Sequence, residues 1–597
     1  MPTVPASTNT TSVGARFLAG CERHGDAEAF RYPVADGRWT SLSWRELATR
    51  ATELAAGLIS LGITQGQRVA IAASTRIEWV EADLAVLLAG ATTTTVYPNT
   101  NADDVAYILN DCGAVAIFAE DSAQVAKLAS GTGWIGGLRH VITFDPVDSP
   151  ATTRLADLRE VGREFLRSNP SAISEILSAT GPDQLATIVY TSGTTGAPKG
   201  VELTHANWLY IGTAVASENV IRKDAVQLLW LPLSHVFGKL LLAAQYEIGF
   251  VTAIDGRVDR IVDNLAAVRP TVMAAAPRIF EKIYSRVVTS AAAAGGIRAR
   301  LFRWAFDAGI DSVRRGAEGR TVPAIGRLQL AIADRLVFAK IRDRLGGRLE
   351  ILFSGSAALA PSIAEWFAAA GLPILEGYGL TEATGVSFVN RPGRLRIGTV
   401  GQPLPGTEVR IADDGEILLR GPGVMRGYHG LPAATAEVLD ADGWFATGDI
   451  GQLEPTGHLR ITDRKKDLVK TSGGKYIAPT AIESAVKAAC PLVSTAIVIA
   501  DGRKFASLLV TLDADACRGI PTETVQTTLD RAIGEVNKTL NRWETIKQFR
   551  ILPGELSVEA GEITPSLKVK RAAVARNHAD LIDSIYTPPA GPRSTPA

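Results

Sequence analysis

Apolar and polar positions alternate along the first two thirds of the chain between patterns typical of helices and patterns typical of strands. From Ser43 to Gly62 apolar residues recur at helical spacing behind a capping-box signature, which predicts a helix. Residues 68–73 and the run that ends at Tyr97 are strand-like, and residues 77–88 between them are helical in pattern. Strands that alternate with helices indicate parallel sheets covered on both faces.

The same alternation returns further along, where apolar runs end at loops rich in glycine, serine or proline. These runs are residues 186–190, 227–231, 271–275, 349–353 and 373–375. Open sheets bind ligands at the loops that follow the carboxyl ends of parallel strands. The pattern therefore predicts a ligand site built from several of these loops.

After about Gly401 the pattern changes to short strands separated by Gly and Asp turns, which predicts a β-rich subdomain. The charged stretch Asp463–Asp467 has few apolar residues and marks a domain boundary. We predict an α/β fold with a large N-terminal domain, residues 1–465, of stacked α/β sheets plus the β-rich subdomain. A small mobile C-terminal α+β domain, residues 466–586, follows, and the proline-rich residues 587–597 are expected to be a disordered tail.

The composition narrows the class of protein. The 597 residues include 62 Lys or Arg and 62 Asp or Glu, and 46% are hydrophobic, which excludes a disordered chain and a strongly basic nucleic-acid binder. The four cysteines form no CxxC pair, so we expect a reducing compartment and no structural zinc. No secretory signal is visible, and polar residues interrupt the most apolar segment, 228–254. We expect a soluble, cytoplasmic protein.

Residues 281–350 form a mostly helical, alanine-rich segment that carries 14 Lys or Arg against 7 Asp or Glu. One interpretation is an insertion packed on the main domain with a solvated basic face. The other is a surface that docks on an anionic membrane, from which an apolar substrate could be drawn.

The segment Tyr190–Gly200, with the sequence YTSGTTGAPKG, follows a predicted strand and combines glycines, hydroxyl side chains and Lys199. Backbone N–H groups, hydroxyls and a cation can together hold a polyphosphate. The segment is not a Walker A loop, because Lys199 is followed by Gly200 rather than by Ser or Thr. A flexible linker would not call for a strand directly before it, so we interpret the segment as a phosphate-binding loop.

This loop resembles a marker of the adenylate-forming superfamily, which contains acyl-CoA synthetases, nonribosomal adenylation domains and beetle luciferases. Further stretches resemble the family's motifs in the family's order, over roughly residues 40 to 571. They are Leu231–His235, Gly355–Ala357, Glu376–Glu382, Thr447–Asp449, Asp463–Asp467 and Leu567–Arg571.

The resemblance implies a two-step reaction. A carboxylate attacks the α-phosphorus of ATP to give an acyl-adenylate and pyrophosphate, and the thiol of coenzyme A then displaces AMP. Two anions meet in the first step, so the site must neutralise charge. The resemblance assigns Mg²⁺ to Thr194 and Glu382, and Mg²⁺ prefers such hard oxygen ligands. Thr381 would contact the α-phosphate, and the phosphates would lie in the loop residues Thr191, Ser192, Gly193, Thr195, Gly196 and Lys199.

For the nucleoside, the resemblance implies recognition of adenine by the backbone of Gly355, Ser356 and Ala357, by the ring of Tyr378 and by the adjoining Gly379. A buried tyrosine is more often a core residue. The position of Tyr378 three residues before Thr381 favours the binding role. Asp449 would accept hydrogen bonds from the ribose hydroxyls, and Arg464 would add a donor to the same sugar.

Lys568 resembles the family's C-terminal catalytic lysine, which reaches the reacting oxygens only when the small domain closes. A lysine in a basic run is usually just exposed, and many members have glycine where Leu567 stands. The resemblance makes Lys466 the hinge of a large rotation, after which Gly473 and Gly474 would line the pantetheine channel. His235 is similar to the residue that controls access of the carboxylate or the thiol.

Two features favour a long acyl chain. The stretch Pro277–Tyr284 and the helical segment after it resemble long-chain fatty acyl-CoA synthetases, and the residues after His235 are apolar. Each buried methylene contributes about 0.8 kcal/mol, so a long tail can supply much of the binding energy. Lys239 stands where a bacterial member uses a tryptophan gate.

The predicted function is a long-chain fatty acid:CoA ligase that uses ATP, Mg²⁺ and coenzyme A. A fatty acyl-AMP ligase that passes its product to a carrier protein is the alternative within the fold. An adenylate sensor without turnover and a light-emitting oxygenase are the other classes considered, and a fold alone cannot separate these chemistries. We expect no nucleic-acid partner, and a homodimer and peripheral contact with the inner face of the membrane through residues 281–350 remain open.

Overall fold

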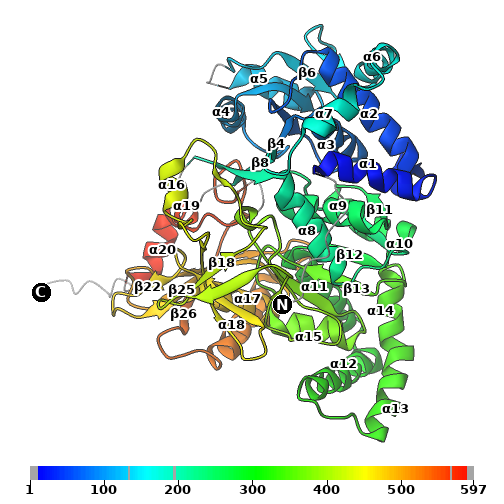
Figure 1. Ribbon diagram of the computed structural model, residues 1–597. Helices are drawn as coiled ribbons and strands as arrows, with labels where there is room; N and C mark the ends of the chain where they lie inside the picture. Colours follow the sequence, from blue (N-terminus) through cyan, green and yellow to red (C-terminus); the bar gives the residue numbers. More distant parts are fainter. Residues whose placement is uncertain (1–10, 36, 132–134, 192–196, 565–567, 588–597) are drawn as a thin grey trace, which may run out of the picture.

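The computed structural model describes residues 11–587, apart from 36, 132–134, 192–196 and 565–567. Within these residues two large sheets lie one above the other in Figure 1. In spatial order the first sheet contains β19 (Gly427–Tyr428), β9 (Lys199–Thr204), β8 (Leu185–Thr191), β4 (Thr92–Val96), β3 (Arg68–Ala72), β5 (Ala114–Ala119), β6 (His140–Thr143) and β7 (Thr153–Arg154). The second contains β16 (Gln402–Pro403), β15 (Phe388–Val389), β14 (Ile374–Tyr378), β13 (Ile351–Ser354), β12 (Val272–Ala275), β10 (Val226–Leu229), β11 (Val251–Ile254), β1 (Glu28–Pro33) and β2 (Trp39–Ser43).

The interior strands of both sheets are parallel, as predicted, and so is the edge strand β7. Antiparallel pairing occurs at β2, at β15 and β16, and at β9 and β19. β8 pairs antiparallel with β9, and Thr191 lies opposite Lys199 in the register. The seven residues between them are too few for a parallel crossover, which needs a dozen or more. The predicted phosphate-binding loop is therefore the connection of a hairpin.

Helices cover both sheets. Those around the first sheet are α2 (Trp44–Ser60), α3 (Ile77–Leu88), α4 (Ala102–Cys112), α5 (Ser122–Ser130), α6 (Leu155–Ser168) and α7 (Ala172–Ala179). Around the second are η1 (Val258–Arg260), α10 (Ile261–Val268), α11 (Pro277–Ala293) and α15 (Pro361–Ala369). Between the sheets α1 (Val13–His24), α8 (His205–Ser217) and α9 (Val236–Ile248) pack on one another.

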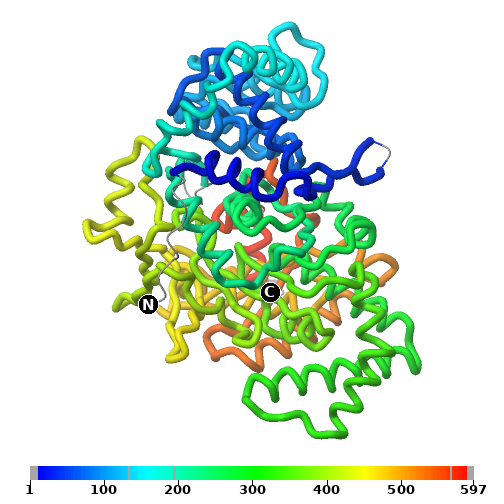
Figure 2. Tube along the Cα trace, turned by 45° about the vertical axis from the view of Figure 1, so that its right-hand side comes forward, coloured from blue at the N-terminus to red at the C-terminus, as the bar shows by residue number. Residues whose placement is uncertain are grey.

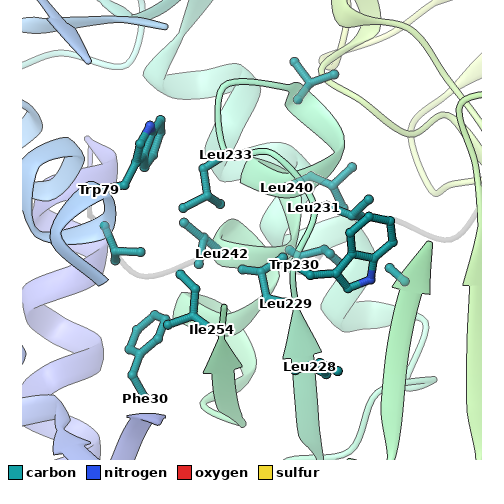
Figure 3. Close-up of a cluster of buried hydrophobic side chains, with 14 of the residues drawn as sticks. Phe30, Trp79, Leu228, Leu229, Trp230, Leu231, Leu233, Leu240, Leu242 and Ile254 are labelled. Atoms are coloured by element: carbon teal, nitrogen blue, oxygen red, sulfur yellow. The ribbon is translucent and has the colours of Figure 1, made fainter. Parts of the chain in front are cut away.

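The predicted helix that begins after Ser43 is α2, and both hydrogen bonds of its capping box with Glu46 are present. One continuous apolar core joins the two sheets. Figure 3 shows part of it, where Trp79 of α3, Leu242 of α9 and Ile254 of β11 lie close to one another. The N-terminal part is thus one packed body rather than two separate sheets.

Helices α2 and α6 approach closely at two glycines. A Cβ atom on Gly162 would lie 1.8 Å from the carbonyl oxygen of Glu53 and 2.6 Å from the backbone nitrogen of Gly57. We expect Gly162→Ala to push the helices apart and lower the free energy of unfolding by about 3 kcal/mol, measured by urea denaturation. Gly316→Ala is the control, because a Cβ there meets nothing within 4 Å and the change should be neutral or slightly stabilising. Equal stability of both variants would contradict this contact.

After the second sheet the chain forms the predicted β-rich subdomain. Its antiparallel sheet contains β17 (Glu408–Ile411), β18 (Glu416–Arg420), β20 (Phe445–Leu453) and β21 (Leu459–Arg464). The short helix α16 (Pro432–Ala436) lies in the connection before β20, and the short helix η3 (Thr381–Ala383) lies between β14 and β15 of the second sheet.

The C-terminal part is α+β and has apolar clusters of its own. Its elements are β22 (Val469–Lys470), β23 (Tyr476–Ile477), α17 (Pro479–Ala489), β24 (Val493–Ile499), β25 (Ala506–Leu512), α18 (Thr522–Asn537), β26 (Ile546–Ile551), α19 (Arg571–Asn577) and α20 (Ala579–Tyr586). Figure 1 shows it beside the β-rich subdomain. The domain boundary at residue 466 stays a prediction, and the predicted tail lies outside the described residues except for Thr587.

The basic segment is helical, as predicted, and extends from the body of the protein (Figure 2). After α11 it contains α12 (Gly296–Ala317), α13 (Ala324–Ala333), the π-helical turn η2 (Asp334–Phe338) and α14 (Ala339–Arg344). Phe306 of α12 stacks on Trp366 of α15, with ring centroids 4.5 Å apart, and fixes the segment to the second sheet. No helix among the described residues is long and apolar enough to cross a membrane.

Candidate active site

The phosphate-binding loop is fixed at both ends by the β8–β9 hairpin. Residues 192–196, which include the predicted ligands Ser192, Gly193, Thr194, Thr195 and Gly196, lie outside the described residues. At the far end, the Nζ atom of Lys199 lies over the ring of Tyr428, 4.8 Å from its centroid. This cation–π contact holds the lysine against the same tyrosine whose hydroxyl contacts Glu382.

Glu382 lies in η3, directly after the strand that carries Tyr378. The hydroxyl of Tyr428 donates a hydrogen bond to Oε1 of Glu382 over 3.0 Å. Burial and the neighbouring Glu382 raise the pKa of Tyr428, so this hydroxyl remains a donor. The Glu382 carbonyl accepts from the backbone of Met425, which holds the turn in place.

Tyr428 is a site residue that the sequence analysis missed. It lies in β19, which pairs antiparallel with β9 and so places Tyr428 opposite Val201, just beyond the phosphate-binding loop. It is 46 residues from Glu382 along the chain, and no motif marks it. The pairing of β19 with β9 places Tyr428 near Lys199, and the hydroxyl of Tyr428 joins it to Glu382.

A second cluster joins the predicted adenine-binding and ribose-binding residues. The hydroxyl of Tyr378 donates to Oδ2 of Asp449 over 2.6 Å, and Nε of Arg464 lies 3.1 Å from Oδ1. Asp449 and Arg464 are directly opposite each other on β20 and β21. Burial raises the pKa of Asp449, and the nearby Arg464, Tyr378 and Lys568 oppose that rise. The carboxylate is thus held by donors on both oxygens.

Lys568 reaches this cluster from the C-terminal part. The side chain of Lys568 is exposed at the surface, and partial desolvation by the surrounding protein together with the charge of Arg464 lowers the pKa of its ammonium. Glu382 and Asp449 act in the opposite direction and favour its charged form. A hydrogen bond from its backbone nitrogen to Oγ1 of Thr564, 3.0 Å long, anchors the residue. The structure therefore brings together a lysine and two carboxylates that are far apart in the sequence.

His235 caps the N-terminus of α9. Its Nδ1 atom accepts a hydrogen bond from the backbone nitrogen of Phe237 over 3.1 Å, which leaves the proton of the neutral ring on Nε2. Burial, reinforced by the charge of Lys568, lowers the pKa of His235 to about 3. The imidazole is therefore neutral at physiological pH and lies within the electrostatic reach of Lys568.

The remaining nucleotide-binding candidates lie at the carboxyl ends of β13 and β14. A Cβ on Gly355 would lie 3.3 Å from the ring of Phe237, so this glycine gives the ring room beside His235. Ser356 has a φ of +71°, in the left-handed region, and Ala357 follows it in an exposed loop. Gly379 passes so close to Gly385 that a Cβ would lie 2.2 Å from its carbonyl oxygen. Thr381 is buried in the next turn.

Three predicted residues lie apart from these clusters. Lys466 is exposed and has no ion pair among the described residues, whereas its neighbour Lys465 bonds Asp414 and Glu416. Gly473 and Gly474 occupy an exposed turn between β22 and β23. Their roles would follow only after the domain rotation and stay predictions.

An ion pair and a hydrogen bond join the C-terminal part, which carries Lys568, to the N-terminal part. Nζ of Lys487, on α17, lies 2.8 Å from Oε1 of Glu281, on α11, and both side chains are largely buried. Nearby, Arg278 donates a hydrogen bond to Oγ of Ser494 over 3.2 Å. These contacts fix the orientation of the C-terminal part that the structure shows.

Lys239 follows His235 by one helical turn and is buried. It forms an ion pair with Asp83 of α3, and its Nζ lies over the rings of Trp79 and Trp208 at 5.5 and 5.4 Å. Asp83 also accepts a 2.8 Å hydrogen bond from Thr93. The leucines 240–242 of the same helix are packed in the core. Lys239 thus connects α9, which lies between the sheets, to α3, which covers the first sheet.

Matches to two protein-family models show the class of protein to which these clusters belong. The AMP-binding enzyme model matches residues 17–429, and the AMP-binding enzyme C-terminal domain model matches residues 466–589. The chain therefore belongs to the AMP-binding enzyme family, which confirms the resemblance found in the sequence.

Two relatives and one solved structure are similar to this chain over most of its length. The long-chain-fatty-acid–CoA ligase FadD15 of Mycobacterium bovis is 36% identical over 93% of this chain and 93% of its own length. The long-chain-fatty-acid–CoA ligase ACSBG1 of Bos taurus is 29% identical over 97% of this chain and 86% of its own. The crystal structure of the anthranilate CoA ligase AuaEII in complex with anthranoyl-AMP has a TM-score of 0.75 at 19% identity and covers 98% of this chain and 100% of its own, which shows the shared fold.

Proposed function

We propose that this protein is an AMP-forming long-chain fatty acid:CoA ligase. The observation that carries the proposal is the convergence of Lys568 with Glu382, Asp449 and His235, side chains from distant parts of the chain. A mixed set of cations and acceptors suits a reaction between two anions. The names of the curated relatives favour coenzyme A over a carrier protein as the acceptor and a long-chain fatty acid as the substrate.

In the first step the chain's own groups would position ATP and neutralise charge. Lys199 and the loop before it would hold the β- and γ-phosphates, and Thr381 the α-phosphate. Asp449 and Arg464 would bind the ribose, and the base would lie against Tyr378 and Gly355–Ala357. Lys568 would stabilise the negative charge that develops as the carboxylate oxygen bonds to the α-phosphorus and pyrophosphate leaves. His235, neutral and carrying its proton on Nε2, would donate to the incoming carboxylate.

The donor chemistry fits a magnesium ion at Glu382. Tyr428 donates a hydrogen bond to one oxygen of this carboxylate, and no other group among the described residues bonds the second oxygen. Mg²⁺ usually takes one or two carboxylates together with phosphate oxygens and water, so Glu382 and Thr194 would suffice. When bound, the ion would reduce the negative charge of the phosphates. No group of three acidic, histidine or cysteine side chains suited to a metal occurs among the described residues.

The second step would need the C-terminal part in another orientation, in which Gly473 and Gly474 line the path of the pantetheine arm. Lys466 is suited to be the hinge, because it is exposed and bonds no carboxylate among the described residues. The thiolate sulfur of coenzyme A would then bond to the acyl carbon, and AMP would leave with the electron pair of the broken C–O bond.

The test is an ATP–pyrophosphate exchange assay over fatty acids of increasing length, followed by addition of coenzyme A. We expect exchange that rises with chain length, and acyl-CoA and AMP in equal amounts after the thiol is added. Exchange without thioester would favour the fatty acyl-AMP ligase. No exchange with any fatty acid would overturn the proposal.

The ion pair between Glu281 and Lys487 gives a prediction about domain orientation. Removing it with Lys487→Met should slow the adenylation half-reaction about fivefold, since a partly screened ion pair contributes on the order of 1 kcal/mol. Thioester formation from supplied acyl-AMP should be unchanged or faster, because it needs the other orientation. Single-turnover assays of each half-reaction measure both effects. The exchanged pair Glu281→Lys/Lys487→Glu should recover adenylation, and equal loss in both half-reactions would contradict the assignment.

We further propose that the protein works in the cytoplasm with peripheral contact to the inner face of the membrane through residues 281–350. The basic excess of that segment supports this. A homodimer is also part of the proposal and is tested by light scattering.

A further inference from the structure

Helix α13 and the turn η2 that continues it expose a row of aliphatic side chains. Ile325, Leu328, Ile332 and Leu336 are 66%, 58%, 43% and 42% exposed. They follow at spacings of three and four residues, so they lie on one face of the helix. Another face of the same segment packs against the rest of the protein, where Ala333, Val337 and Phe338 are buried in the core. The exposed row is therefore not needed for packing within the chain.

Positive charges accompany this row. Arg335 is three residues after Ile332 and Lys340 is four residues after Leu336, so both lie beside the row. Both are exposed, and neither has an ion pair within the part of the chain that the structure describes. Several acidic side chains of the segment are already neutralised by neighbouring arginines: Asp311 by Arg315, Glu318 by Arg320 and Asp334 by Arg342. The surface thus offers aliphatic contact and unpaired cations together.

We propose that this row is the surface with which the protein docks on an anionic lipid bilayer. Aliphatic side chains can enter the boundary between headgroups and acyl chains while the flanking cations contact negative headgroups. Figure 2 shows α12 and α13 extending beyond the rest of the molecule, so a flat surface can approach them. A second copy is a poorer occupant, because pairing the row with itself would bring the cations Arg335 and Lys340 of both copies into one interface.

Docking would bring the ligase to the lipid phase in which long-chain fatty acids dissolve, and this consequence rests on the proposed function. The docking surface itself depends only on the exposed row and its charges.

The test is co-sedimentation of the full chain with phosphatidylglycerol-containing vesicles and with pure phosphatidylcholine vesicles. The double variant Ile325→Ser/Leu328→Ser removes half of the row. The matched control is Val161→Ser/Leu453→Ser, which replaces two aliphatic side chains that are 47% and 43% exposed elsewhere on the protein. We expect the parent and the control to bind anionic vesicles and to release in high salt. The double variant should lose binding by roughly tenfold or more.

Equal binding by the two double variants, or no binding by the parent, would overturn the proposal. Size-exclusion chromatography gives a second contradicting outcome. If the parent elutes as a dimer, and the Ile325→Ser/Leu328→Ser variant elutes as a monomer that still binds vesicles, the row joins two copies and the proposal is wrong. Exchange assays with octanoate, which is water-soluble, are run on all three proteins without vesicles. Their activity should be the same, and inactivity of the parent with octanoate and with every longer fatty acid would count against the proposed function and not against the docking surface.

Discussion

The Lys568→Ala variant is expected to lose fatty-acid-dependent ATP–pyrophosphate exchange by at least about a hundredfold. Lys568 is the cation that the C-terminal part brings to Glu382 and Asp449, and removing it leaves the developing charge on the α-phosphate without that partner. Conversion of supplied acyl-AMP and coenzyme A to the thioester should change little, because that step uses the other orientation of the domain.

Lys570→Ala is the matched control for this experiment. Lys570 belongs to the same basic run, but it stands at the start of α19 and is not among the groups that chiefly shift the pKa of Asp449, whereas Lys568 is. It should retain exchange activity close to that of the parent. If Lys568→Ala slowed both half-reactions equally, the role assigned to Lys568 would be wrong.

The Glu382→Ala variant should show the second large effect, a loss of the first half-reaction of roughly a hundredfold or more together with a higher Mg²⁺ concentration at half-saturation. The carboxylate is the one metal ligand that the resemblance places among the described residues, and Tyr428 holds it in position. The rate of pyrophosphate release is measured against Mg²⁺ concentration.

Two further variants separate charge from position at this site. Glu382→Gln keeps an oxygen that accepts from Tyr428 but removes the charge, so it should resemble Glu382→Ala in its response to Mg²⁺. Tyr428→Phe keeps the carboxylate and removes only the hydrogen bond, so a smaller loss is expected. An unchanged Mg²⁺ dependence in Glu382→Gln would count against metal binding by this residue.

Much of the fold could be predicted from local patterns. The helix α2 was recognisable because its apolar periodicity and its capping box are contained in a few consecutive residues. The antiparallel edges, such as the pairing of β9 with β19, were not predictable, because β19 is only two residues long and its partner lies more than 220 residues away. Short strands have too few residues for a periodicity to appear.

The candidate site shows the same division between local and long-range information. Asp449, Arg464 and Tyr378 belong to short motifs, and the structure brings these three side chains into contact. Tyr428 lies in no such motif and depends on strand pairing for its position. The contact between Glu281 and Lys487 could not be predicted from the sequence either, because it depends on how two folded parts of the chain pack together.

The buried pair of Lys239 and Asp83 has a consequence for how this protein can evolve. Replacing either residue alone would leave the other as a buried charge without a partner and would lower the free energy of unfolding by roughly 3–5 kcal/mol. Replacing both by apolar residues of similar volume would avoid that cost. The two positions are therefore expected to covary among relatives, so that a lysine on α9 accompanies an acid on α3 and a neutral residue on one helix accompanies a neutral residue on the other.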